Sequence, residues 1–238
     1  MKKTIRGKKY QNAAKLVLEK LQGKNNFVLQ DAVHVLTETS TVTFDPSCEV
    51  HINLDIDPKQ SDQMVRSTVV LPHGTGKSVK IIAFVPDELV KDAIQAGVIE
   101  AGLDTLIDKI NKGWLDFDIA VAHPDAMKSL GKVAKILGPK GLMPNPKAGT
   151  VSADIVKIIN ELKAGKVEFR ADKDGNLHNT FGKISFGKEK LFNNVKAYLK
   201  AVVDAKPSSL KGSYIRSITF ATTMGPGIPV DVSDAMKA

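Results

Sequence analysis

The sequence predicts an α/β protein with two domains, a split α+β domain formed by both ends of the chain and an inserted three-layer α/β domain with a mostly parallel sheet. Three observations lead to this prediction. Strands with one polar face mix with amphipathic helices at both ends, nearly continuous apolar strands alternate with helices in the middle, and the positive charge concentrates at the ends. With 238 residues, the chain is long enough for two domains.

The N-terminal part begins with helical spacing of apolar residues over 13–21, including Leu18, and again over 28–36. From Cys48 to Ile56 apolar and polar residues alternate, which predicts a strand with one buried and one wet face. The buried face includes Cys48, which we therefore expect in the core and not as a nucleophile.

The middle of the chain differs, because its short strands are nearly continuous apolar runs. The runs 79–85 and 118–123 are each followed by a proline and an acidic residue, which is typical of a helix start. A candidate strand at 98–101 and a helix at 104–112 lie between them. Strands buried on both faces and separated by helices predict a parallel sheet with helices on both sides.

The C-terminal part returns to the first pattern. Alternation around Val167 and Phe169, and around Ile184 and Phe186, predicts two more antiparallel strands, and helical spacing follows from Leu191 to Val202. We therefore place one domain at 1–67 and 160–238 and the inserted domain at 68–159. Lys and Arg exceed Asp and Glu by 11 to 10 in the insert but by 23 to 16 in the ends, so a polyanion-binding surface is expected on the split domain.

The apparent catalytic motifs fail on their spacing. The run 74–78, Gly-Thr-Gly-Lys-Ser, lacks the first glycine of a phosphate loop, because position 71 is Leu71, and it precedes a strand. No Gly-x-Gly-x-x-Gly follows a strand, the five histidines show no metal-binding spacing, and one cysteine permits no internal disulfide. We expect no enzyme activity, no cofactor and no metal. Without an apolar span or secretory signal, a cytoplasmic location is expected, with no membrane partner.

Two segments have features typical of surfaces that contact a ligand. The loop 135–147 is stiffened by three prolines and presents Lys140 and Lys147. The segment 217–227, Ser-Ile-Thr-Phe-Ala-Thr-Thr-Met-Gly-Pro-Gly, ends a strand in two hydroxyls, a methionine and a turn. Hydroxyls and backbone groups of this kind suit the sugar-lined minor groove of RNA.

These motifs together resemble the bacterial form of the family of large-subunit ribosomal protein one, which forms the mobile stalk beside the tRNA exit site. The resemblance covers Phe44 to Pro58 and on to Gln63, the run 71–77, the loop 138–146, and 222–226. Thr43 departs from it, because relatives commonly carry lysine there.

The resemblance implies an RNA-binding structural protein, monomeric within the ribosome, that binds large-subunit ribosomal RNA of the stalk. It further implies that the protein assists release of deacylated exit-site tRNA and represses its own operon by binding the mRNA. The implied RNA contacts are Phe44, Ser47, Asp172, Ser217, Thr222, Thr223, Met224 and Gly225, with Lys140 and Lys147 as secondary contacts to RNA or tRNA.

Two other functions stay open from the residues alone. The apolar strands and the glycine-rich 74–78 run favour an α/β enzyme that binds a nucleotide, and the basic balance favours a general RNA chaperone without target preference.

Overall fold

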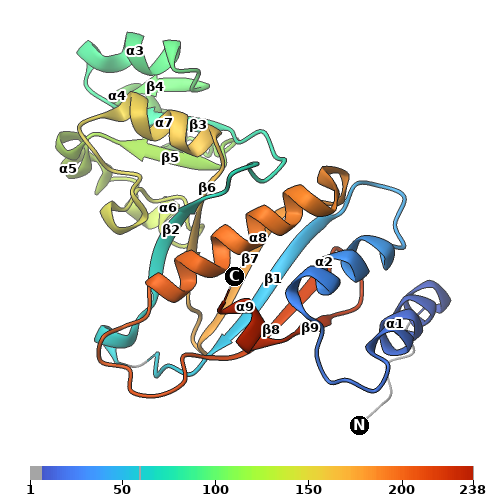
Figure 1. Ribbon diagram of the computed structural model, residues 1–238. Coiled ribbons are helices and arrows are strands. Elements are labelled where there is room, and N and C mark those ends of the chain that lie inside the picture. Colours follow the sequence, from blue (N-terminus) through green and yellow to red (C-terminus); the bar gives the residue numbers. More distant parts are fainter. Residues whose placement is uncertain (1–6, 59, 238) are drawn as a thin grey trace. The chain divides into compact units, whose positions relative to one another are not determined.

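The computed structural model describes residues 7–58 and 60–237 of the chain. They divide into two compact units, a terminal unit of 1–76 and 168–238 and an inserted unit of 77–167. The mixed α/β class is confirmed (Figure 1). None of the described helices is long and apolar enough to cross a membrane.

The terminal unit is built on an antiparallel sheet with the spatial order β7-β1-β8-β9. Its strands are β1 (Ser47–Leu54), β7 (Asn176–Lys183), β8 (Ile215–Thr222) and β9 (Ile228–Val230). The expected alternation in β1 is confirmed, because every second residue from Cys48 to Leu54 is buried. Helices α2 (Leu29–Glu38) and α8 (Gly187–Asp204) pack against each other and on this buried face (Figure 1).

Two sequence-based predictions for this unit were wrong. The stretch Ile184–Phe186 is a 3-10 helix and not a strand, because the Asp45 carboxylate binds the backbone and hydroxyl of Ser185 and draws the chain out of the sheet. In α1 (Lys8–Leu21), Leu18 is 68% exposed, and only Ala13 and Val17 are buried.

The remaining elements of the terminal unit are short. They are the 3-10 helix η1 (Ser61–Gln63), the strand β2 (Arg66–Val70), which pairs with β6 (Lys166–Arg170), and the last helix α9 (Val232–Ala235). Asp231 caps α9, since its carboxylate accepts a hydrogen bond from the Asp234 amide at 3.0 Å.

The inserted unit has a parallel sheet in the order β4-β3-β5, as the apolar runs predicted. Its strands are β3 (Ile81–Phe84), β4 (Glu100–Gly102) and β5 (Ile119–Ala122). Its helices are α3 (Val90–Gln95), α4 (Asp104–Asn111), α5 (Met127–Leu130), α6 (Ala134–Leu137) and α7 (Ile155–Lys163), with the 3-10 turns η2 (Asp87–Leu89), η3 (Pro124–Ala126) and η4 (Pro146–Ala148). Ile82 belongs to a core with α4, α5 and α6, and Ile81 to a second core with α3 and α7, which gives the three layers.

The units divide at 76/77 and 167/168, later than the expected 67/68 and 159/160. Asn194 of α8 accepts a hydrogen bond from the His73 amide and donates one to the Gly74 carbonyl, which keeps 68–76 with the terminal unit. Helix α7 stays with the insert, because Ile158 and Leu162 are buried in its second core.

Candidate nucleic-acid interface

The second face of the four-stranded sheet carries polar side chains along its whole length. On β1 these are Ser47, Glu49, His51 and Asn53, all partly exposed. On β8, register places Thr219 opposite His51 and Ser217 opposite Asn53. A sheet face with hydroxyls, amides and imidazoles in rows offers many hydrogen-bonding groups to a ligand and little apolar area.

At one end of this face, Thr223 joins β8 to the start of β1. The Thr223 amide donates to the Ser47 carbonyl at 3.0 Å, and the Ser47 amide donates to the Thr223 hydroxyl at 3.2 Å. The segment around Ser47 and the turn after Thr222 are therefore held together, although they are 176 residues apart.

Met224 is the most unusual residue of this end. Its backbone has a φ of 66°, and its side chain is 74% exposed. It is the third residue of a turn closed by a 2.8 Å hydrogen bond from the Gly225 amide to the Thr222 carbonyl. Left-handed backbone costs a residue with a Cβ about 1–2 kcal/mol, and such strain gathers at functional sites. The turn thus holds an apolar side chain out in solvent at a cost in stability.

Phe44 is the second large apolar side chain at this end, with 56% of its surface exposed. The neighbouring Asp45 is anchored, because its carboxylate accepts hydrogen bonds from the Ser185 hydroxyl at 2.7 Å and the Ser185 amide at 3.1 Å. These hydrogen bonds lower the pKa of Asp45, and the bond from the Ser185 hydroxyl contributes most. An exposed aromatic ring on a fixed segment is suited to contact with a base or a sugar.

The other end of the face holds Ser217 and Asp172. The side chain of Asn53 donates to that of Asn176 at 2.7 Å, between Ser217 on one side and the turn of Asp172 on the other. The Asp172 carboxylate accepts hydrogen bonds from the amides of Asn176 at 2.7 Å and Asp174 at 2.9 Å. The expected contacts therefore fall into two groups at opposite ends of β1, not one cluster.

Thr222 and Gly225 differ from the sequence-based view of this segment. Thr222 is only 4% exposed, because it lies opposite Cys48 on the buried side, and its hydroxyl has no hydrogen-bond partner among the described residues. Gly225 does not adopt positive φ. A Cβ at Gly225 would lie 2.1 Å from the Thr222 hydroxyl oxygen, so glycine is required by this close approach.

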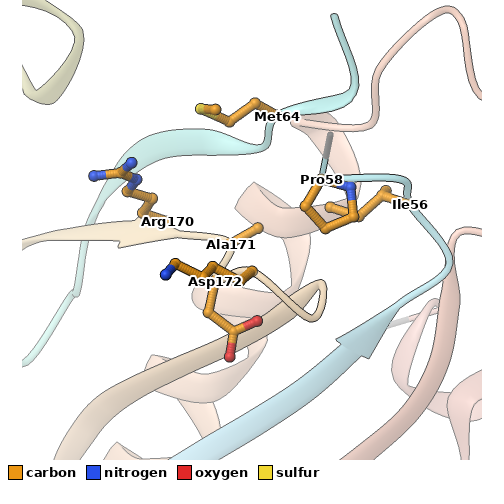
Figure 2. A pocket seen from close by; sticks show the side chains of 7 residues that line it. Ile56, Pro58, Met64, Arg170, Ala171 and Asp172 are labelled. Carbon is orange, nitrogen blue, oxygen red and sulfur yellow. The ribbon is translucent and has the colours of Figure 1, made fainter. Parts of the chain in front are cut away.

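A shallow pocket of about 410 Å³ adjoins Asp172, between the segment before β2 and the turn after β6 (Figure 2). It combines apolar and basic groups, and its lining is Ile56, Pro58, Met64, Arg170, Ala171, Asp172 and Lys173. Sequence reasoning missed Arg170 and Lys173, although the run of charged residues around Asp172 was a signal for them. It also missed Asn53 and His51, which the alternation had already placed on the wet face.

The secondary candidates belong to the inserted unit. Lys140 is exposed in the loop after α6, and Lys147 lies in η4, with a side chain outside the described part of the structure. Cys48 is fully buried, and burial first of all raises its thiol pKa to about 12, which agrees with a core role. Within residues 7–58 and 60–237, no three or more His, Cys, Asp or Glu side chains are grouped to hold a metal.

The two units and their sheets define a protein of the two-domain α/β class. The chain matches the ribosomal protein L1p/L10e family over residues 36–226, which is most of its length.

Similar proteins support this family match. It is 50% identical to the "Large ribosomal subunit protein uL1" of Frankia alni over 226 residues, 95% of this chain and 93% of the relative. It is 48% identical to the protein of the same name from Protochlamydia amoebophila (92% and 93% covered) and 47% identical to that of Thermobifida fusca (98% and 97% covered). The chain belongs to the ribosomal protein L1p/L10e family, and the resemblance seen in its motifs is confirmed. This family consists of structural, non-enzymatic proteins, which removes the enzyme alternative.

Proposed function

We propose that this protein is a structural component of the large ribosomal subunit in the cytoplasm, and that its terminal unit binds ribosomal RNA of the stalk through the polar sheet face. The relatives' name supports the ribosomal assignment. The terminal unit also carries most of the chain's positive charge, which attracts a polyanion.

The main observation that supports the RNA contact is the exposed side chain of Met224. A solvent-exposed methionine held at positive φ costs stability and gains nothing within the unit. A partner that covers it would recover the apolar burial. Ser47, Thr223 and the Phe44 ring lie at the same end of β1 and supply polar and stacking contacts. Recognition then depends on shape and sugar contacts in addition to charge.

The test is the affinity for a stalk ribosomal RNA fragment, with an unrelated hairpin of equal length as competitor. Met224→Ala keeps the net charge and the need for positive φ but removes the exposed side chain. We expect it to weaken binding about tenfold or more, because burying a methionine side chain contributes about 1.5–3 kcal/mol. Met236→Ala is the matched control, since Met236 is also an exposed methionine of the terminal unit, at 48%.

The outcomes separate the alternatives. The proposal is supported if Met224→Ala loses RNA affinity, Met236→Ala does not, and the parent prefers the stalk fragment to the unrelated hairpin. Equal affinity for both hairpins and no effect of either substitution would indicate the general RNA chaperone.

Two finer roles follow from the family. We propose that the same face binds the protein's own operon mRNA and so represses it, and that the Lys140 loop contacts exit-site tRNA during its release. If so, Met224→Ala weakens mRNA and ribosomal RNA binding in parallel. Lys140→Gln leaves both unchanged and slows release of deacylated tRNA from reconstituted ribosomes. An mRNA affinity that Met224→Ala does not change would contradict the shared face.

A further inference from the structure

Two histidines meet in the centre of the polar sheet face. His51 of β1 and His178 of β7 are directly opposite each other in the strand register, although they are 127 residues apart in sequence. Their Nδ1 atoms are 2.9 Å apart, and the ring centroids are 5.1 Å apart. Neighbouring strands thus hold two imidazoles with the same nitrogen of each ring turned toward the other.

The other nitrogen of each ring faces a carboxylate. Glu49 Oε2 lies 3.7 Å from His51 Nε2, and Asp172 Oδ2 lies 3.5 Å from His178 Nε2. A carboxylate at this position favours the tautomer with the proton on Nε2, as in histidine ligands oriented by an outer carboxylate. At 2.9 Å the two Nδ1 atoms share one proton in an N–H···N hydrogen bond, and a cation that binds both atoms takes the place of this proton, which is released. The Nε2 protons of both rings then face the carboxylates.

The charges around the pair also favour a cation. When both rings are neutral, Glu49 and Asp172 leave this spot with two negative charges. Burial and then the neighbouring His178 lower the pKa of His51, while Glu49 acts in the opposite direction. A neutral imidazole is the form of histidine that binds metal.

We propose that His51 and His178 form a binding site for a divalent transition metal of the nickel or copper type, with Glu49 and Asp172 as orienting carboxylates. Bonds of about 2.0–2.1 Å from both Nδ1 atoms to one ion, at the observed separation, give an angle of roughly 90° at the metal. This is the angle between neighbouring ligands in a tetragonal or octahedral site, whereas tetrahedral zinc needs a wider one. Water completes the coordination, because the face is open to solvent. The site does not depend on the proposed RNA binding.

The test is Ni²⁺ titration of the chelator-treated full-length protein by calorimetry at pH 7.5. We expect one equivalent to bind, with tighter binding of Ni²⁺ than of Zn²⁺. His51→Gln or His178→Gln should abolish this binding. Glu49→Gln, which leaves both rings in place, should weaken it about tenfold, as loss of an outer carboxylate does.

His73→Gln is the matched control, because His73 is exposed in the same unit and far from the pair in sequence. It should bind Ni²⁺ as the parent does. Thermal unfolding without metal shows that each variant is folded, and imidazole ¹⁵N resonances should report Ni²⁺ at Nδ1 of both rings. The proposal is overturned if one equivalent of Ni²⁺ fails to bind, if binding survives both histidine substitutions, or if Zn²⁺ binds more tightly than Ni²⁺.

Discussion

Gly225 gives the most direct test of how the turn after β8 is built. A Cβ at this position would lie 2.1 Å from the Thr222 hydroxyl oxygen, 3.3 Å from the Thr222 Cβ and 3.3 Å from its carbonyl oxygen. The backbone of Gly225 is not at positive φ, so the cost of a side chain comes from this collision and not from backbone strain. Thr222 has little room to turn away, because it is 96% buried against the core.

We expect Gly225→Ala to destabilise the terminal unit by about 1–3 kcal/mol, the usual cost of forcing an extra carbon into a packed site. At about 2–4 °C per kcal/mol for a chain of this size, a 2 kcal/mol loss lowers the unfolding midpoint by about 4–8 °C. In a Thr222→Ala background the hydroxyl is gone, and the same substitution should cost less than about 1 kcal/mol. For a 2 kcal/mol loss in the parent, the coupling between the two sites is then at least about 1 kcal/mol, as expected for residues in contact.

The assay is thermal unfolding followed by two probes. Trp114, the single tryptophan, packs in the core of the inserted unit, so its fluorescence follows that unit, while circular dichroism follows both. Only the transition of the terminal unit should move. If Gly225→Ala lowers the free energy of unfolding equally in the parent and in the Thr222→Ala background, the collision with the Thr222 hydroxyl is refuted. If Gly225→Ala shifts only the Trp114 transition, the assignment of its effect to the terminal unit is refuted.

Three further outcomes follow from the structure. Asn194→Ala should cost about 2–4 kcal/mol by denaturant unfolding, because this buried amide donates to the Gly74 and Phe181 carbonyls and accepts from the His73 amide; a loss below 0.5 kcal/mol would contradict it. Partial burial raises the pKa of Asp172, but the hydrogen bonds that its carboxylate accepts more than offset this and lower it. The turn is therefore complete above the ordinary value of 3.8 and should open as the pH falls below it, seen as faster amide exchange there, whereas unchanged exchange down to pH 2 would argue against the bonds. Cys48, buried and with a pKa of about 12, should resist iodoacetamide at pH 8 until the terminal unit unfolds, which mass spectrometry of the labelled protein measures.

Part of the candidate site could be predicted from the sequence. Alternation from Cys48 to Ile56 depends only on which residues prefer water, so it placed β1 and its wet face correctly. The apolar runs of the middle likewise predicted a parallel sheet, because a strand buried on both faces has no polar positions. The motifs around Phe44 and Met224 carried the family resemblance.

The rest depended on packing between distant segments. The sequence-based view grouped Thr222 with Thr223 as contacts, although Ile218, Phe220 and Thr222 alternate along one face of β8. The register with β1 puts Thr222 opposite the buried Cys48, on the inner face. The expected strand at 184–186 was lost to the hydrogen bonds between Ser185 and Asp45, which are 140 residues apart in sequence.

Local preferences along the chain thus determined the type of each main element and the division into a basic split part and a nearly neutral insert. Only the tertiary structure decided which polar side chains meet, because strand pairing brings together residues more than a hundred positions apart. His51 and His178 show this most clearly. Neither has a neighbour in sequence that suggests a site, and the register of β1 with β7 alone puts their rings in contact.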